Sequence, residues 1–296
     1  MHMHDHSEKR IGWVILFNVA IVIAEYIGGL LSGSLALLSD AGHNFSDVLS
    51  LIISYIGERF SHSESTKRHS FGFKRFEVAA AFINALSLCV IAIIIIIEAM
   101  GRLGSGREIS LGIMLPVAIA GLLGNIFSVA LLVKEKGKNL NMKSAYLHLA
   151  YDALSSVFVI IAAVAIALTH LAVIDVAISL VIALMMLWSG LGVLKQALHI
   201  FMQGVPDGID FQSVHNDLVS LDGVRSVHDL HIWSVNSEDV FLSCHACLEE
   251  KQDSDQINGL IIKANGVLKE KYGITHSAIQ FEYAGICKAG GVCCEK

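Results

Sequence analysis

Six long apolar stretches occupy the first two thirds of the chain, and they constrain its fold more than any other feature. A helix needs roughly 20 apolar residues to cross about 30 Å of hydrocarbon, and each stretch reaches that length. Only 16% of the residues are charged, whereas a soluble domain has about 25%. We therefore expect an α-helical membrane protein with six transmembrane helices in a lipid bilayer. The expected spans are Ile11–Leu31, Leu35–Ile56, Val78–Met100, Leu111–Val133, Ala145–Thr169 and Ala172–Leu194.

Lysine and arginine are concentrated in the loops after the second and fourth expected spans. Because positively charged loops stay in the cytoplasm, this pattern predicts that both termini are cytoplasmic. Compact loops and short termini favour a bacterial inner membrane. The net charge of −6 gives no reason to expect nucleic acid as a partner.

A His-x-x-x-Asp pattern occurs twice, as His43 with Asp47 in the second span and as His148 with Asp152 in the fifth. Residues four apart lie on one face of a helix, so each pair points in a common direction. A carboxylate near the bilayer centre costs about 3 kcal/mol, and each one needs a partner. At a rise of about 1.5 Å per residue, Asp47 and Asp152 lie about 12 Å and 10 Å from the cytoplasmic side. The similar depths predict one shared site with four ligands.

These four side chains form a nitrogen-and-oxygen set that suits tetrahedral Zn²⁺. Two carboxylates neutralise a dication, which lowers the cost of burying either charge. The alternative is that each pair is a structural hydrogen bond between helices, but this does not require the same spacing twice. Imidazole and carboxylate also suit Cd²⁺, Co²⁺ and Fe²⁺, and cytosolic availability favours zinc.

The predicted site also provides a coupling mechanism, because protons compete with metal for imidazole and carboxylate. The sequence therefore predicts a Zn²⁺/H⁺ antiporter that exposes one site alternately to the two sides. A membrane metal sensor is one alternative. An intramembrane zinc enzyme is another, but it usually needs a general acid or base in an HExxH-type motif, which does not occur here, so we expect no enzyme. Asp40 and Glu25 are weaker candidates, either for lining the pathway or for contacts between helices.

The composition changes after the segment Gly204–Gly208 to that of a small α+β domain. Alternating and helical patterns predict two helices and three strands: Ile209–Leu221, Asp255–Tyr272, Val224–Val235, Val240–Leu248 and His276–Tyr283. The expected domains are a cytoplasmic histidine-containing tail (1–10), a transport domain (11–200), a cytoplasmic regulatory and dimerisation domain (201–285) and a cysteine-containing tail (286–296). A core of about 80 residues is small, so dimerisation would help its stability.

Four motifs resemble the cation diffusion facilitator family: Leu38–Asp47, His69–Glu77, His148–Asp152 and Val227–Ser234. They are separated along the chain, occur in the family's order and extend the match over nearly the whole chain. The resemblance implies a homodimeric Zn²⁺/H⁺ antiporter of the zinc-exporting branch. It also implies a cytoplasmic domain with a metallochaperone-like αββαβ fold. One departure is Phe73, which stands where some bacterial relatives have a histidine that binds a second metal ion.

The resemblance also implies that the tail domain binds zinc through four positions: His228, His245, His276 and Glu282. Cys244 and Cys247 are expected to be structural, because residues three apart in a strand point to opposite faces. The two ends of the chain carry further candidate ligands: His2, His4, His6, Cys287, Cys293 and Cys294. These residues either form a mixed Cys/His zinc site together or bind metal as two separate tails.

Overall fold

The computed structural model describes residues 2–61, 66–103, 108–132 and 140–283. Within these ranges some side chains lie outside the description, including those of residues 2–15 and 140–151. The chain divides into two compact units. The first comprises Met1–Arg59 and Ala80–Leu194, and the second comprises Phe60–Ala79 and Lys195–Lys296.

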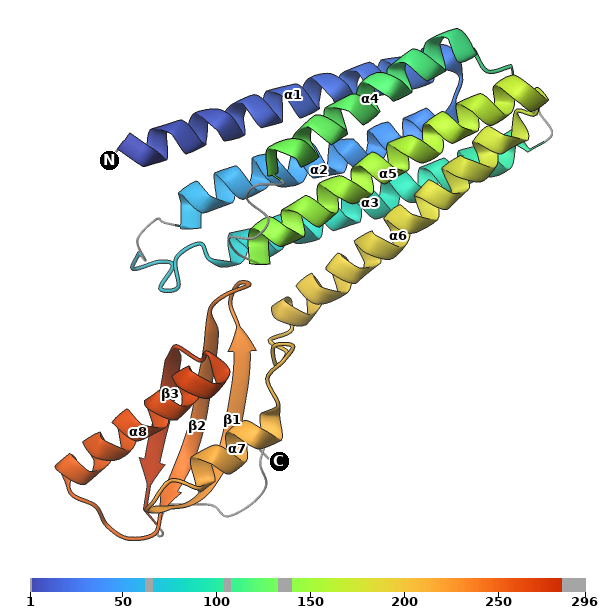
Figure 1. Cartoon of the computed structure of the whole chain (residues 1–296). Helices are drawn as coiled ribbons and strands as arrows, with labels where there is room; N and C mark the ends of the chain where they lie inside the picture. The colour runs from blue at the N-terminus through green and yellow to red at the C-terminus, as the bar shows by residue number, and fades with distance from the viewer. Residues whose placement is uncertain (1, 62–65, 104–107, 133–139, 284–296) are drawn as a thin grey trace. The chain divides into compact units, whose positions relative to one another are not determined.

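Six helices build the first unit (Figure 1). They are α1 (His2–Ser32), α2 (Leu35–Ser61), α3 (Arg75–Arg102), α4 (Leu111–Leu132), α5 (Leu140–Thr169) and α6 (Val173–Phe201). Each coincides with one of the six apolar stretches, and most continue into the polar residues beside it. The prediction of six helices in this part of the chain is therefore confirmed.

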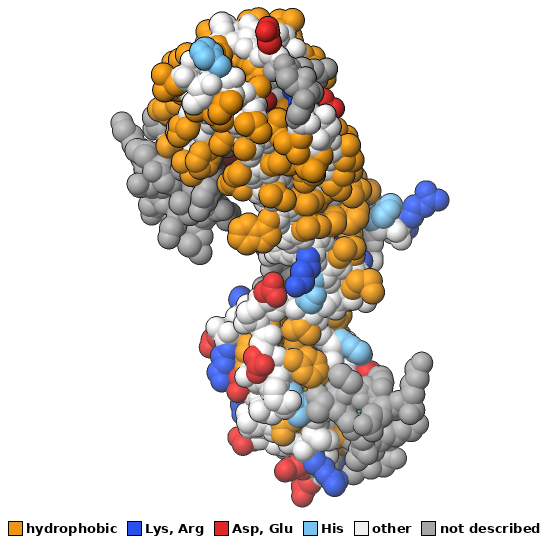
Figure 2. Space-filling model, turned by 90° about the vertical axis from the view of Figure 1, so that its right-hand side faces the viewer, with side chains coloured by type: hydrophobic (Ala, Val, Ile, Leu, Met, Phe, Trp, Pro, Cys, Tyr) orange, Lys and Arg blue, Asp and Glu red, His pale blue; other side chains and the backbone are white. Residues whose placement is uncertain are grey.

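Where their side chains are described, these helices expose many large hydrophobic residues. Figure 2 shows hydrophobic side chains over most of the visible face of these helices, and Trp188 of α6 is 82% exposed. A water-soluble protein rarely exposes so continuous an apolar surface. Among the described residues, three helices are long and apolar enough to cross a membrane, and two shorter apolar segments accompany them. These are Arg75–Arg102, Asp152–Thr169 and Val173–Phe201, with the shorter Leu16–Ser32 and Leu111–Phe127.

Glycines allow α1 and α4 to approach each other closely. A Cβ atom on Gly28 would lie 2.8 Å from the side chain of Val117, and one on Gly121 would overlap Glu25 Oε1. Helices in lipid gain little from hydrophobic burial against each other, so small residues and close packing hold them together. This packing places Glu25 inside the bundle, where it is only 1% exposed.

A carboxylate from α6 fixes the beginning of α2. Asp175 accepts hydrogen bonds from the backbone N–H groups of Leu35 (2.6 Å) and Ala36 (3.3 Å) and from the hydroxyl of Ser34 (2.6 Å). The first N–H groups of a helix have no partner within the helix, and the helix dipole favours a negative charge beside them. Asp175 therefore positions the helix that carries the first His-x-x-x-Asp motif.

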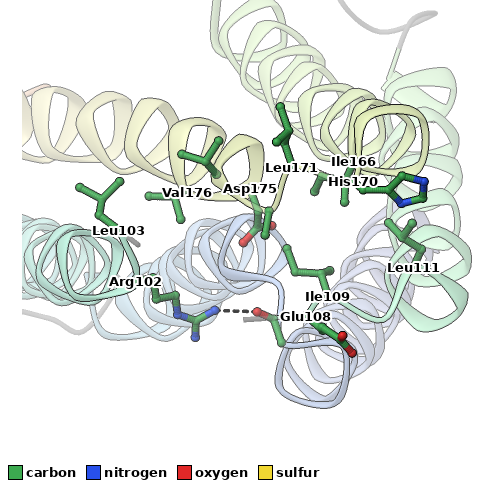
Figure 3. Close-up of a pocket in the computed structure, with 13 residues that line it drawn as sticks. Arg102, Leu103, Glu108, Ile109, Leu111, Ile166, His170, Leu171, Asp175 and Val176 are labelled. Carbon is green, nitrogen blue, oxygen red and sulfur yellow. Dashed lines mark hydrogen bonds between the residues drawn. The ribbon is translucent and has the colours of Figure 1, made fainter. Parts of the chain in front are cut away.

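A cavity of about 600 Å³ lies at this end of the bundle, lined by Asp175 and Arg102 among others. Figure 3 shows the residues that line it. The Arg102 guanidinium donates to the carbonyl of Gly33 at 2.6 Å and to Glu98 Oε1 at 2.9 Å. Gly33 has a φ of +72°, which glycine adopts without the cost that a side chain brings. The turn between α1 and α2 is therefore held from two sides, by Arg102 and by Asp175.

The tail domain has the αββαβ order that the family resemblance implied. Its elements are α7 (Phe211–Val219), β1 (Val224–Ser234), β2 (Val240–Leu248), α8 (Ser254–Tyr272) and β3 (His276–Glu282). The strands form one sheet in the order β1-β2-β3, with β1 antiparallel and β3 parallel to β2. In Figure 1 both helices of this domain cover the same face of the sheet, and Leu230 and Leu268 are buried in the shared core.

The second unit also includes the residues just before and at the start of α3. Lys74 Nζ lies 2.8 Å from Asp239 Oδ2, in the turn between β1 and β2. The hydroxyl of Ser237 in the same turn donates to Glu77 Oε1 at 2.5 Å. These contacts join residues 66–79 to the hairpin of the tail domain within one unit.

Replacement of Asp175 by alanine would remove the acceptor for two buried N–H groups at the start of α2. We expect the free energy of unfolding to fall by about 2 kcal/mol, measured as a lower Tm of the full-length protein in detergent. Ser179→Ala on the same helix is the matched control, because the Ser179 hydroxyl donates to carbonyls of its own helix. An equal loss of Tm in both variants would contradict the capping role.

Candidate metal sites

His43 and Asp47 of α2 meet Asp152 of α5 inside the six-helix unit. His43 Nε2 lies 3.2 Å from Asp152 Oδ1 and 3.7 Å from Asp47 Oδ2. One ligand atom from each residue lies within 4.8 Å of the others, a separation that a single metal ion can bridge. Asp152 is 2% exposed, so water screens its charge little. Three of the four expected ligands therefore lie together.

The fourth expected ligand, His148, belongs to α5, but its side chain lies outside the described residues. It precedes Asp152 by four residues. Because one helical turn brings residues four apart onto one face, the backbone puts His148 on the same face of α5 as Asp152.

The donor atoms of this cluster determine which ions it suits. Imidazole nitrogen with carboxylate oxygen suits Zn²⁺ and other borderline divalent ions, and the described cluster offers no sulfur that would favour Cu(I). The same atoms bind protons, since a protonated His43 would lie between two carboxylates. Metal and proton therefore compete for one set of atoms.

Two further carboxylates are buried near this cluster. Glu25 and Asp40 are each 1% exposed. Asp40 accepts hydrogen bonds from the hydroxyls of Ser155 (2.6 Å) and Ser156 (2.9 Å), so it lies at the contact between α2 and α5. Glu25 Oε2 accepts a hydrogen bond from Asn44 Nδ2 at 2.8 Å, which joins α1 to α2.

The serine network was missed by sequence reasoning, although a signal for it exists. Ser155 and Ser156 follow Asp152 by three and four residues, which is the spacing that shares a helix face. Asn125 Nδ2 of α4 donates to Ser156 Oγ at 3.1 Å, and the Ser156 hydroxyl donates in turn, with Asp40 Oδ2 at 2.9 Å as the nearer acceptor and the carbonyl of Asp152 at 3.2 Å. The network therefore extends over α2, α4 and α5.

A second cluster lies on the sheet of the tail domain. His228 of β1 pairs in register with His245 of β2, and Cys247 of β2 pairs with Glu282 of β3. His245 Nδ1 lies 2.7 Å from Glu282 Oε1, and His228 Nε2 lies 3.5 Å from Glu282 Oε2. Ligand atoms of His228, Cys247 and Glu282 lie within 4.8 Å of one another. Three of the four expected tail ligands are therefore neighbours.

The two cysteines of β2 point to opposite faces, as the strand period predicts. Cys244 is buried in the hydrophobic core, and this burial raises the pKa of its thiol to about 12. Cys247 Sγ lies 3.8 Å from His228 Nδ1, so this residue belongs beside the cluster, where sequence reasoning gave it only a structural role. The missed signal is its spacing of two from His245, which puts both on one strand face. Cys247 is disulfide-bonded in this structure, so its sulfur can coordinate a metal only after reduction.

Asp229 approaches the cluster from a bulge in β1. Its φ is +51°, and the register of β1 against β2 shifts between His228 and His231. Asp229 Oδ2 lies 3.8 Å from His245 Nε2, and Oδ1 lies 2.9 Å from His231 Nε2. Aspartate tolerates the left-handed region better than most residues, and a bulge re-aims the side chain it carries. No feature of the sequence pattern indicates this bulge.

The remaining expected ligands lie apart from the cluster or outside the description. His276 begins β3 opposite Phe241, and their ring centroids are 4.8 Å apart. It precedes Glu282 by six residues, about 20 Å along a strand, so the structure does not bring it to His228. The tail residues Cys287, Cys293 and Cys294 lie outside the described residues, as do the side chains of His2, His4 and His6.

Comparisons with known proteins agree with this architecture. The cation efflux transmembrane domain matches residues 13–202, and the cytoplasmic domain of cation efflux proteins matches residues 206–284. A cadmium, cobalt and zinc/H(+)-K(+) antiporter of Bacillus velezensis is 37% identical over 289 residues, which cover 96% of this chain and 92% of that protein. The zinc transporter ZitB of Yersinia pestis is 37% identical over 281 residues, which cover 94% and 89%.

A solved structure is also similar to part of this chain. It is the metal-bound C-terminal domain of the CzcD transporter from Cupriavidus metallidurans, which is 31% identical and covers 25% of this chain and 99% of that one, with a TM-score of 0.23.

The match to the transmembrane domain alone spans more than half of the chain, and the relatives align over most of their own length. The resemblance that four short motifs carried is thereby confirmed, and so is the expectation of a transporter rather than an enzyme. The chain belongs to the cation efflux family, with both the transmembrane and the cytoplasmic domain of that family.

Proposed function

We propose that this protein exports Zn²⁺ from the cytoplasm in exchange for protons, and that His43, Asp47, His148 and Asp152 bind the ion. The observation that carries the proposal is the convergence of His43, Asp47 and Asp152 within 4.8 Å between α2 and α5. The names of the relatives support the substrate class, since one is a cadmium, cobalt and zinc antiporter and the other a zinc transporter. Zn²⁺ is the first substrate we propose, with Cd²⁺, Co²⁺ and Fe²⁺ as alternatives that the same donors suit.

Exchange follows from competition at one site. His43 binds metal through a neutral imidazole, and Asp47 and Asp152 bind it as carboxylates. Metal entering from the cytoplasm displaces protons from these atoms, and protons arriving at lower pH on the other side displace the metal. Each proton that moves down one pH unit supplies about 1.4 kcal/mol. A single site that opens alternately to the two sides is therefore sufficient for coupled export.

We propose that residues 11–200 form the transport domain, in a bacterial inner membrane with both termini in the cytoplasm. The lysine and arginine residues of two alternate loops support this orientation, and the bacterial relatives support the location. Residues 201–285 would form a regulatory domain that joins two copies of the chain into a homodimer. The small core of this domain supports that assignment, because pairing buries further surface.

Replacement of His43 or Asp152 by alanine removes a proposed metal ligand. We expect Zn²⁺ uptake into proteoliposomes to fall by more than the roughly 10- to 100-fold that loss of an outer-shell partner causes, with loss of the lumenal pH change. Glu98→Gln is the control, because Glu98 is half exposed and pairs with Arg102 at the end of α3. Wild-type flux in both alanine variants would rule out the site assignment. Zinc binding by the wild-type protein without flux of Zn²⁺ or H⁺ would favour a sensor.

We propose a second zinc site in the tail domain, formed by His228, His245 and Glu282 with the reduced thiol of Cys247. The short distances among these side chains support it, and zinc accepts both imidazole and thiolate. Zinc bound here would hold all three strands together and would act as a structural or regulatory ligand.

The two cysteines of β2 offer a matched test of the tail site. In reduced full-length protein that also carries His43→Ala, we expect Cys247→Ser to lower zinc affinity at least about 10-fold, measured by competition with a chromophoric chelator. Cys244→Ser should leave the affinity unchanged, because Cys244 faces the core. Equal affinities in the two serine variants would exclude Cys247 as a ligand. His276→Ala in the same assay decides whether that separate histidine contributes.

A further inference from the structure

Glu25 is a buried acid of the six-helix unit whose side-chain oxygens receive only one hydrogen bond from the described residues. It is 1% exposed, and its Oε1 has no hydrogen-bond partner among the described residues. Oε2 accepts one hydrogen bond, from Asn44 Nδ2 at 2.8 Å. The backbone of α4 closes over Oε1, because a Cβ atom on Gly121 would overlap it. A carboxylate in such a place is costly, so the group must either hold a proton or face a cation.

The titratable groups that face Glu25 come from two helices. Asp40 and His43 act from α2, and Asp152 acts from α5. The third neighbouring helix, α4, carries no titratable residue between Leu111 and Leu132. Two of the three groups are acids, so negative charge predominates around Glu25.

Hydrogen bonding distinguishes Glu25 from Asp40. The hydroxyls of Ser155 and Ser156 both donate to Asp40, and such donors stabilise a carboxylate. Glu25 receives a single donor and keeps one oxygen free to carry a proton. Of the two neighbouring acids, Glu25 is therefore the one that is built to bind and release a proton.

We propose that Glu25 is a proton-binding residue of the transport cycle, distinct from the metal ligands. This inference rests on the proposed function of the cluster of His43, Asp47 and Asp152. When Zn²⁺ reaches that cluster, its charge favours ionisation of Glu25: the O–H bond breaks, the proton leaves to water on the open side, and the carboxylate remains beside the dication. When the metal leaves on the other side, Glu25 takes up a proton from there. Each cycle then carries one proton more than the ligands alone exchange.

Glu25→Gln tests the proposal because glutamine keeps the size and the acceptor oxygen but cannot ionise. We measure the ratio of Zn²⁺ concentrations across proteoliposomes at zero net flux, with an imposed gradient of one pH unit and the voltage clamped at zero. One proton fewer per Zn²⁺ lowers this ratio about 10-fold, while transport itself persists. Glu25→Asp keeps an ionisable group and should restore the wild-type ratio. Glu98→Gln removes a carboxylate from α3, elsewhere in the six-helix unit, and should not change the ratio.

A second measurement needs no variant of this residue. Infrared difference spectra of wild-type protein should show loss of a protonated-carboxyl band on addition of Zn²⁺, and the band should shift in protein labelled with carboxyl-¹³C glutamate. A wild-type ratio in Glu25→Gln would overturn the proposal. If that variant does not fold, absence of the glutamate band in the wild-type spectra would overturn it instead. A wild-type ratio that does not respond to the pH gradient would contradict proton-coupled export itself, whichever residue carries the proton.

Discussion

Compensation of buried negative charge is the constraint on which the six-helix unit depends. Glu25, Asp40 and Asp152 are each almost inaccessible to water. Acids in such places persist only where partners offset the cost of their burial. The chain supplies an imidazole to Asp152, two hydroxyls to Asp40 and one amide to Glu25. In the proposed transport cycle, metal ions and protons would offset the charge that these partners leave.

The second helix organises this arrangement because it carries the motif residues on about two turns. Asp40 and His43 contact α5, and Asn44 contacts α1, so a small rotation of α2 would change all of these contacts. Asp175 fixes the first turn of α2 through two backbone N–H groups, and Arg102 fixes the turn before it. The close contact of α1 with α4 sets the position of Glu25 independently.

The length and periodicity of apolar segments predicted the features of this protein that involve a single helix or strand. Apolar length predicted the six helices, alternation predicted β2 with the bounds that it has, and the four-residue spacing predicted that His43 and Asp47 share a face. Matching depth extended this to the meeting of α2 with α5. Contacts between different elements were harder to predict from the sequence, because the periodicity of one helix does not determine how that helix is rotated toward each of its neighbours. The serines around Asp40 and the bond from Asn44 to Glu25 belong to that class. In the tail domain, the left-handed residue Asp229 moves the register of β1, which alternation alone cannot reveal.

The close approach at Gly121 has a consequence for how this membrane domain can change over evolutionary time. Because any side chain at residue 121 would occupy the space of the Glu25 carboxyl, alanine there is compatible only with a smaller or displaced residue on α1. The residues at positions 25 and 121 therefore depend on each other, and substitutions at them should occur together among homologous chains. Gly121 has no ionisable side chain, yet it restricts which ionisable residues homologous chains can have inside the bundle.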